Sequence, residues 1–283
     1  MSKFFDQSVR TRNVTATFEE AQQPEVQKGP EVVPDAQPAP VEVEASLLGG
    51  CQRLEIPLTS LLQSRFQGSD SLEPVQEAYR ALRTRMLRLR SAQGLRSIVI
   101  TSAVQGEGKT LTSLNLAMCC AQLHDMRVLL VDTDIRSLGL TRLVGMPEGP
   151  GLSEVLAGTC APEKAILSTD LPNLHILPGG TPTMPPAELL ASRRFQEFVS
   201  WSTENFKIVL LDAPPVLNLA DVEIITAGCD GVLMVVRGQK TRRDVLQKSA
   251  GQIDPKKLLG VVYNAAEGIH HRYTYAYQDT QEK

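Results

Sequence analysis

The sequence predicts an α/β fold built on a mostly parallel β-sheet that helices cover on both faces. Short apolar runs alternate with longer amphipathic stretches along most of the chain. Such runs are typical of strands buried on both faces, and amphipathic helices usually connect parallel strands. Three of the runs end in glycine-rich or acidic motifs, at the edge where parallel sheets bind ligands.

The alternation begins after Gly94 and predicts elements of both kinds. Strands are expected at residues 97–101, 127–131, 174–177, 207–211, 232–236 and 259–263. Helices are expected at residues 110–123, 152–157, 187–204, 221–228 and 241–253. One more helix is expected to begin near Ser71, because apolar residues then recur at steps of three and four. These are Val75, Tyr79, Leu82, Met86 and Leu89.

The 283 residues suffice for one sizeable domain with tails. Residues 1–70 are rich in proline, glutamate and glutamine and cannot bury a core, so they predict a flexible, disordered arm. We expect a P-loop-containing domain at 71–268 and a short tail at 269–283. A net charge of −3 favours no nucleic-acid partner. No apolar run is long enough to span a bilayer, so a cytoplasmic location is expected.

The segment 103–110, Ala-Val-Gln-Gly-Glu-Gly-Lys-Thr, has the spacing of a phosphate-binding loop between a strand and a helix. Gly106 and Gly108 let backbone N–H groups turn toward phosphate oxygens at the helix N-terminus. Lys109 is expected to reach the β- and γ-phosphates of ATP, and Thr110 to ligate Mg²⁺. The predicted nucleotide-binding residues here are Gln105, Gly106, Glu107, Gly108, Lys109, Thr110 and Leu111.

Carboxylates end two other apolar runs. Asp212 precedes two prolines, and Asp132 and Asp134 lie two residues apart, so in an extended segment both point the same way. One can help to hold Mg²⁺ while the other accepts a proton from an incoming hydroxyl. A hydrolase needs only to position water, so the second carboxylate favours a kinase. We expect Mg²⁺, Lys109 and Arg136 to relieve the repulsion between the two.

Together these motifs resemble those of the bacterial tyrosine kinases (BY-kinases) of exopolysaccharide and capsule synthesis, which have a P-loop NTPase fold. The resemblance covers about residues 72–264, and segments 151–158, 186–190 and 235–242 also match. It implies that Lys109, Asp132, Asp134 and Asp212 form the catalytic set. Asp132 would assist the attacking tyrosine, and Thr110, Asp134 and Asp212 would organise the metal. Asn264 matches a position that contacts adenine.

The resemblance also implies a ring-like homo-oligomer. Glu77, Arg80 and Arg83 match a family motif that packs neighbouring subunits together. The spacing alone fits a second interpretation equally well, in which Glu77 and Arg80 only pair along a solvated helix.

The family ends in a tyrosine cluster that a neighbouring subunit phosphorylates, and Tyr273, Tyr275 and Tyr277 occupy this place. Alternating tyrosines could instead form an edge strand. The chain resembles the split form of the family, which a membrane chain-length-regulator protein activates and recruits to the inner face of the plasma membrane. A tyrosine phosphatase is a further possible partner.

One departure from the family pattern and two competing functions remain. The family commonly has a basic residue and a proline where this chain has Ser137 and Leu138, so the local loop geometry is expected to differ. Partitioning or division-type ATPases carry a signature lysine where this chain has Val104. A regulatory subunit that binds nucleotide without transferring phosphate is the other alternative, although every expected catalytic side chain is present.

Overall fold

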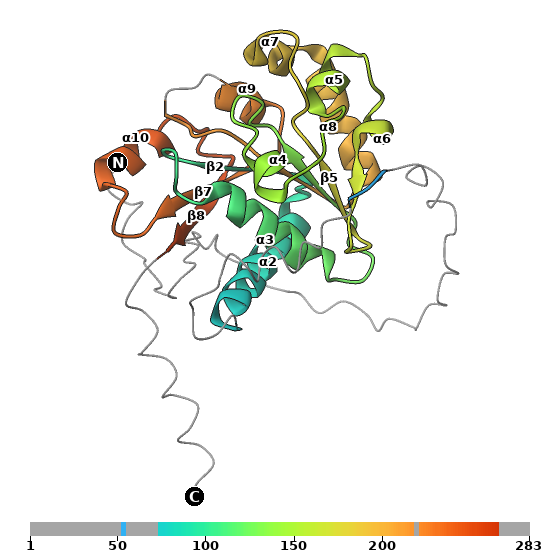
Figure 1. The fold of residues 1–283 in the computed structure, drawn as a ribbon. Coiled ribbons are helices and arrows are strands. Elements are labelled where there is room, and N and C mark those ends of the chain that lie inside the picture. The colour runs from blue at the N-terminus through green and yellow to red at the C-terminus, as the bar shows by residue number, and fades with distance from the viewer. Residues whose placement is uncertain (1–51, 55–72, 218–220, 266–283) are drawn as a thin grey trace, which may run out of the picture.

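The computed structural model describes residues 52–54, 73–217 and 221–265, and within them one eight-stranded sheet lies at the centre (Figure 1). Its order is β1-β4-β5-β3-β6-β2-β7-β8, and only the β4–β5 pair is antiparallel. The strands are β1 Gln52–Arg53, β2 Ser97–Ser102, β3 Val128–Asp132, β4 Leu167–Ser168, β5 Leu174–Leu177, β6 Ile208–Asp212, β7 Gly231–Arg237 and β8 Leu258–Asn264. The predicted α/β class is confirmed.

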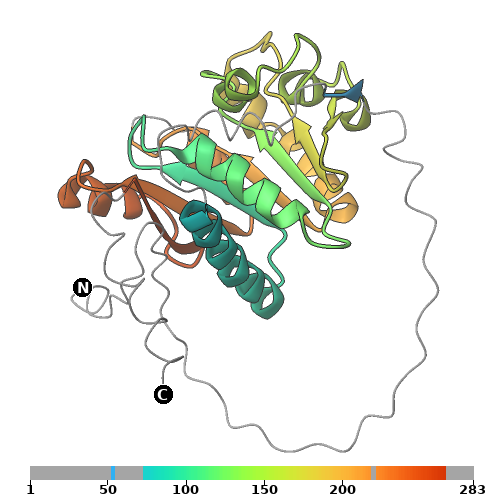
Figure 2. The same cartoon turned by 60° about the horizontal axis from the view of Figure 1, so that its bottom comes forward.

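Helices cover both faces of the sheet. They are α2 Glu73–Gln93, α3 Lys109–Ala121, α4 Gly139–Val144, α5 Leu152–Ala157, α6 Pro162–Ala165, α7 Pro186–Ala191, α8 Arg193–Asn205, α9 Asp221–Ala227 and α10 Arg243–Ala250. In Figure 2, α3 (green) lies across the sheet and α2 (teal) packs outside it. The α5, α7, α8 and α9 helices contribute to the apolar core on the other face.

The sheet divides the apolar interior into two cores. Along β2, Ile98 and Ile100 belong to the core under α2 and α3, whereas Val99 belongs to the core under α8 and α9. All three side chains are fully buried, which explains why the strand is apolar on both faces. Burying such a side chain stabilises the fold by roughly 1.5–3 kcal/mol. Both cores therefore hold the strand ends in place.

The expected helix at 187–204 is two helices, because the chain leaves the helical conformation at Ser192. Its ψ is 153°, and its hydroxyl donates to the Leu189 carbonyl at 2.6 Å. A serine that bonds the preceding turn offers the backbone an alternative to the helix. The single-helix prediction was therefore wrong at this position.

Part of the predicted arm belongs to the sheet. Gln52 and Arg53 pair in parallel with β4, and the Leu54 N–H donates to the Ser168 carbonyl at 2.7 Å. Leu54 is buried in the core under α2 and α3. The rest of the arm, and the tail with Tyr273, Tyr275 and Tyr277, lie outside the described residues.

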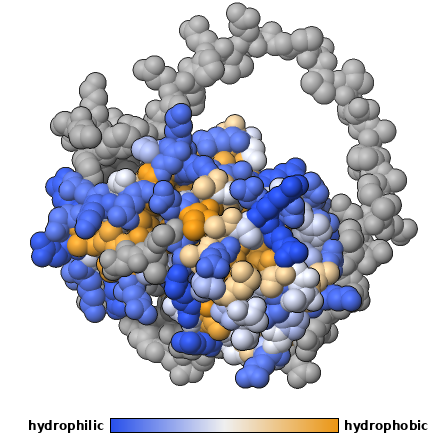
Figure 3. Space-filling view, turned by 90° about the horizontal axis from the view of Figure 1, so that it is seen from above, coloured by the Kyte–Doolittle hydropathy of each residue, from blue (hydrophilic) through white to orange (hydrophobic). Residues whose placement is uncertain are grey.

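From above, hydrophilic residues occupy much of the visible surface, and apolar residues form smaller areas between them (Figure 3). Among the described residues, Val104, Met184 and Tyr263 are the large apolar side chains with substantial exposure. None of the helices in this part of the chain is long and apolar enough to cross a membrane.

Candidate active site

The expected motifs converge at the carboxyl ends of three adjacent strands. The β6 strand lies between β3 and β2, and Asp132 is directly opposite Asp212 in the register of β3 and β6. The phosphate-binding loop connects β2 to α3 on the other side of β6. Since these strands are parallel, their ends bring Lys109, Asp132, Asp134 and Asp212 together, as the sequence predicts.

The phosphate-binding loop has the backbone shape that its glycines permit. Gly106 and Gly108 have φ of 83° and 90°, a left-handed conformation that other residues adopt at a cost. No side chain caps the N-terminus of α3, so its first N–H groups remain available for an anion. A Cβ atom at Gly108 would overlap Asn264 Nδ2. Asn264 thus lies directly against the loop, where its Nδ2 donates to the Glu107 carbonyl at 2.9 Å.

Lys109 lies between two of the carboxylates. Its Nζ is 3.1 Å from Asp134 Oδ2, which is a hydrogen-bonded ion pair, and 3.8 Å from Asp212 Oδ2, which is too long for a hydrogen bond. Asp212 Oδ1 accepts from the Ser113 hydroxyl at 3.0 Å. Burial raises the pKa of Asp212, while Lys109 and the hydroxyls of Thr110 and Ser113 oppose the shift. This side of the site is organised around one cation.

Asp132 has different surroundings. Its Oδ2 accepts from the N–H and the hydroxyl of Thr141 at 2.9 and 2.8 Å, and its Oδ1 has no hydrogen-bond partner. Burial and then the charge of Asp212 raise the pKa of Asp132 to about 7, although the Thr141 bonds lower it. The side chain is fully buried. A carboxylate with this pKa and a free oxygen is suited to accepting a proton near neutral pH.

Arg136 does not pair with either aspartate of its own motif. Its Nε and Nη2 bind the buried Asp221 carboxylate at 2.6 and 3.1 Å, at the start of α9. The charge of Arg136 acts on Asp134 as expected, but its hydrogen-bonded partner is Asp221. The bidentate geometry of guanidinium and carboxylate favours the pair that forms.

The loop after the second motif has a conformation that proline cannot adopt. Leu138 has a φ of 49°, whereas a proline ring fixes φ near −65°. The expected difference from the family's common pattern is thus visible in the backbone. It leaves the carboxylates in place and leads directly into α4.

The site fits a magnesium ion that is also held by phosphate and water. Among the described residues, no group of three or more His, Cys, Asp or Glu side chains could hold a metal. Magnesium in nucleotide sites usually takes one or two protein ligands and keeps water and phosphate oxygens as the others. Asp212 Oδ2 is buried without a hydrogen-bond partner, and Lys109 Nζ lies 3.8 Å from this oxygen and 3.3 Å from the Thr110 hydroxyl. Asp212 Oδ2 and the Thr110 hydroxyl match that chemistry.

Sequence reasoning missed the neutral side chains that support the carboxylates. Thr141 and Ser113 bond Asp132 and Asp212, and the Thr141 hydroxyl also accepts from the Gly179 N–H at 3.2 Å. Thr141 belongs to α4, which the sequence pattern did not predict because the helix has only six residues. A threonine nine residues after the first aspartate is too common a feature to have identified it.

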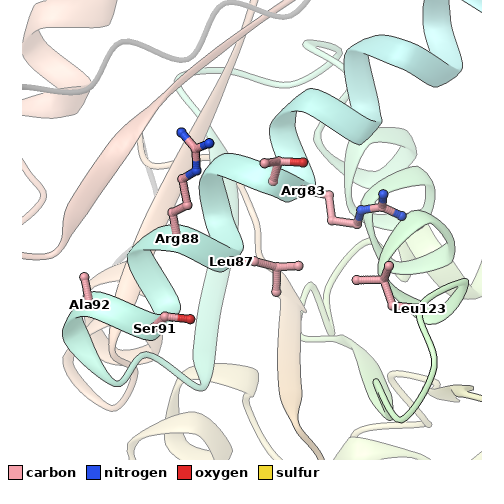
Figure 4. Close-up of a pocket in the computed structure, with 7 residues that line it drawn as sticks. Arg83, Leu87, Arg88, Ser91, Ala92 and Leu123 are labelled. Carbon is pink, nitrogen blue, oxygen red and sulfur yellow. The ribbon is translucent and has the colours of Figure 1, made fainter. Parts of the chain in front are cut away.

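The three residues of the expected subunit interface lie on the outer helix α2. Glu77 and Arg80 form an exposed ion pair of 3.2 Å, as the second interpretation expected. Arg83 Nη1 instead donates to the Cys119 carbonyl of α3 at 2.7 Å. Figure 4 shows Arg83 extending toward Leu123 and Arg88 pointing away from it. Both arginines line an open groove of about 640 Å³ along α2, which Leu123, just after α3, also lines.

Comparison with known proteins agrees with this geometry. A family model described as an AAA domain matches residues 95–248. The tyrosine-protein kinase YwqD of Bacillus subtilis is 31% identical over 208 residues, which cover 73% of this chain and 87% of that protein. This chain belongs to the bacterial tyrosine kinase family. It is thus a protein-tyrosine kinase with a P-loop NTPase fold.

Relatives of different length share the BY-kinase domain. The tyrosine-protein kinase wzc of Salmonella typhi is 33% identical over 206 residues, which cover 72% of this chain but only 28% of that protein. The kinase domain of Escherichia coli tyrosine kinase ETK superposes with a TM-score of 0.66 at 26% identity, covering 84% of this chain and all of that domain. The similarity therefore concerns the kinase domain.

Proposed function

We propose that this BY-kinase is an ATP- and Mg²⁺-dependent autokinase that phosphorylates Tyr273, Tyr275 and Tyr277 of a neighbouring subunit. One observation carries the proposal: the buried carboxylates have two kinds of surroundings. Asp134 and Asp212 lie within 4 Å of the Lys109 cation, whereas Asp132 accepts hydrogen bonds only from the neutral groups of Thr141. This division gives separate groups for holding the phosphates with their metal and for accepting a proton.

The loop and Lys109 bind and orient the phosphates of ATP. Backbone N–H groups at the start of α3 point to the phosphate oxygens, and Lys109 adds a positive charge beside them. Thr110 and Asp212 would hold Mg²⁺, with Asp134 beside them. Bound Mg²⁺ would neutralise charge on the β- and γ-phosphates. Positioning and charge neutralisation supply most of the catalysis in this kind of transfer.

Asp132 acts on the acceptor. Its Oδ1 takes the proton of the tyrosine hydroxyl as the tyrosine oxygen forms a bond to the γ-phosphorus. The bond between that phosphorus and the bridging oxygen breaks, and ADP leaves with the electron pair. Thr141 holds Asp132 by its other oxygen and leaves Oδ1 without a hydrogen-bond partner.

The proposed regulation follows from the family. Phosphorylation of the tail would regulate the synthesis and export of an exopolysaccharide or capsule. A membrane chain-length-regulator protein would activate the kinase and bring it to the inner face of the plasma membrane, and a tyrosine phosphatase would reset it. The exposed Glu77–Arg80 pair and Arg83, all on α2, are the proposed contacts between subunits in a ring.

Two variants test the proposal directly. Lys109→Met should abolish phosphorylation of the tail while the circular dichroism spectrum stays that of a folded α/β protein. Tyr273, Tyr275 and Tyr277 replaced together by Phe should lose most of the label and still bind ATP. The measurement is phosphoamino-acid analysis with labelled ATP, with and without the cytoplasmic tail peptide of the membrane partner. ATP hydrolysis without any phosphotyrosine in the wild-type chain would overturn the proposal.

A further inference from the structure

Glu107 places a negatively charged side chain within a loop that binds anions, and the residue is only 2% exposed. Both of its oxygens have partners. Oε2 accepts from the Val104 N–H at 2.9 Å, and Oε1 accepts from the Thr241 hydroxyl. The charge is thus held against the first residues of the loop and against a second segment of the chain. A buried carboxylate that is bonded in this way fixes the atoms around it.

The Thr241 hydroxyl is itself fixed by its own turn. Thr241 lies between β7 and α10, and its hydroxyl oxygen accepts from the Arg237 N–H at 3.2 Å. Its backbone N–H donates to the Arg237 carbonyl at 3.1 Å. A hydroxyl has a single hydrogen, and here that hydrogen is donated to Glu107. The turn therefore presents one directed donor to the loop.

Two further side chains hold the same part of the loop. Arg237 Nη1 lies 3.4 Å from the Gly106 carbonyl, and Asn264 Nδ2 lies 2.9 Å from the Glu107 carbonyl. Both residues come from β7 and β8, on the opposite side of β2 from the strands that carry the aspartates. The loop is thus supported from one side by neutral and basic groups, while the acidic groups lie on the other.

These contacts from other segments matter because two glycines give the loop much conformational freedom. Gly106 and Gly108 have left-handed backbones, but a glycine can adopt many other conformations as well. In addition, no side chain caps the N-terminus of α3. Phosphate binding requires the N–H groups of the loop to converge. Contacts from outside the loop then decide how often the unbound loop has the binding shape.

We propose that Glu107 and Thr241 are positioning residues that hold the phosphate-binding loop in its binding shape, so that the β7–α10 turn sets the affinity for ATP. This inference deepens the proposed function and rests on ATP binding at this loop. It does not depend on transfer to tyrosine.

Thr241→Val tests the inference, because valine keeps the shape of threonine and removes the hydroxyl, which donates to Glu107 and accepts from the Arg237 N–H. The dissociation constant of a fluorescent ATP analogue with Mg²⁺ should rise about tenfold in the full chain, since Glu107 Oε1 loses its partner in a buried place. The KM for ATP should rise by a similar factor, and kcat at saturating ATP should stay within about twofold. Thr241→Ser restores the hydroxyl and should restore the affinity.

Thr203→Val is a matched control, because the Thr203 hydroxyl bonds only the Ser200 carbonyl within α8, away from the site. Its affinity for ATP should equal that of the wild type. A purely structural role for Thr241 would lower the melting temperature and leave the affinity unchanged, and that result would overturn the inference. Failure of Thr241→Ser to restore binding would do the same.

If Thr241→Val does not fold, Glu107→Gln carries the test, because it replaces one of the two accepting oxygens by a donor. Its affinity for the analogue should fall several-fold, and wild-type affinity would contradict the inference. A wild-type chain that binds the analogue but never labels tyrosine contradicts the proposed function alone. A wild-type chain that binds no ATP contradicts both.

Discussion

The two sides of the active site treat their carboxylates differently. On the Lys109 side, Asp134 and Asp212 lie within 4 Å of an ammonium group, and Ser113 and Thr110 add hydroxyl donors to Asp212. On the Thr141 side, Asp132 has only neutral donors. The two aspartates of one motif, separated by a single residue, therefore differ in whether a cation faces them.

This difference teaches how one short motif can serve two chemical roles. A nearby cation favours the charged form of a carboxylate, which suits it to phosphate and metal sites. Burial without a cation favours the neutral form, so that a proton is taken up readily near pH 7. The backbone brings Asp132 and Asp134 to one strand end, and Lys109 of α3 and Thr141 of α4 then give them different surroundings.

Asp132→Asn should remove the proton acceptor and leave the Lys109 side intact. We expect phosphorylation of the tail to fall by about 10²–10⁴-fold, while the affinity for ATP changes by less than about threefold. Radiolabel incorporation and fluorescent-nucleotide binding measure the two quantities. Asp125→Asn is the control, because Asp125 is exposed and its left-handed backbone suits asparagine. Loss of ATP binding in Asp132→Asn would mean that the two sides are not separate.

The pH dependence gives the next largest effect. At pH values below its pKa of about 7, Asp132 holds a proton and cannot accept another. The activity should therefore rise with pH. At low ATP concentration, kcat/KM for tail phosphorylation should be about tenfold higher at pH 8 than at pH 6. Nucleotide binding over the same range, measured separately, controls for the titration of ATP. A rate that is flat from pH 6 to 8 is incompatible with Asp132 as the acceptor at this pKa.

The same shift has a consequence for stability with a definite sign. The folded pKa of Asp132 lies above its unfolded value of about 4, so the native state binds more protons between these two pH values. The contribution of Asp132 to the free energy of unfolding must then fall as the pH rises from about 4 to 7. Asp132→Asn removes this pH-dependent contribution, so the substitution should raise the melting temperature at pH 8 more than at pH 5.

Arg136→Lys should have the smallest effect. Lysine keeps the charge but loses the bidentate contact with Asp221, and the Arg136 side chain is 44% exposed, which weakens the pair. We expect a loss of about 1 kcal/mol, or a melting temperature lower by about 2–4 °C. Tail phosphorylation should change less than about threefold, because Arg136 pairs with neither aspartate of its motif. A loss as large as that of Asp132→Asn would place Arg136 within the catalytic set.

The sequence predicted the strands and the acidic motifs well, because both depend on local patterns. An apolar run such as residues 208–211 marks a doubly buried strand, and a parallel sheet must bring the ends of its neighbouring strands together. Lys109, Asp132, Asp134 and Asp212 were therefore found at one place before any coordinates.

The remaining features depend on contacts between distant segments. Thr141 supports Asp132 only because a six-residue helix folds back over the end of β3, and such a helix has too few positions to show a period. The break at Ser192 depends on whether the Leu189 carbonyl accepts from the Ser192 hydroxyl or the backbone continues its helical hydrogen bonds. Gln52 and Arg53 pair with a strand more than a hundred positions later, which no local pattern records.

The two ends of the described sheet lie far apart. The β1 and β8 strands are its opposite edges, and strands in a sheet are about 4.8 Å apart, so seven spacings separate them by about 34 Å. The polypeptide enters the sheet at one edge and leaves after Asn264 at the other. A force applied to the chain at β1 would thus act on the edge of the sheet remote from β8, where the described part of the chain ends.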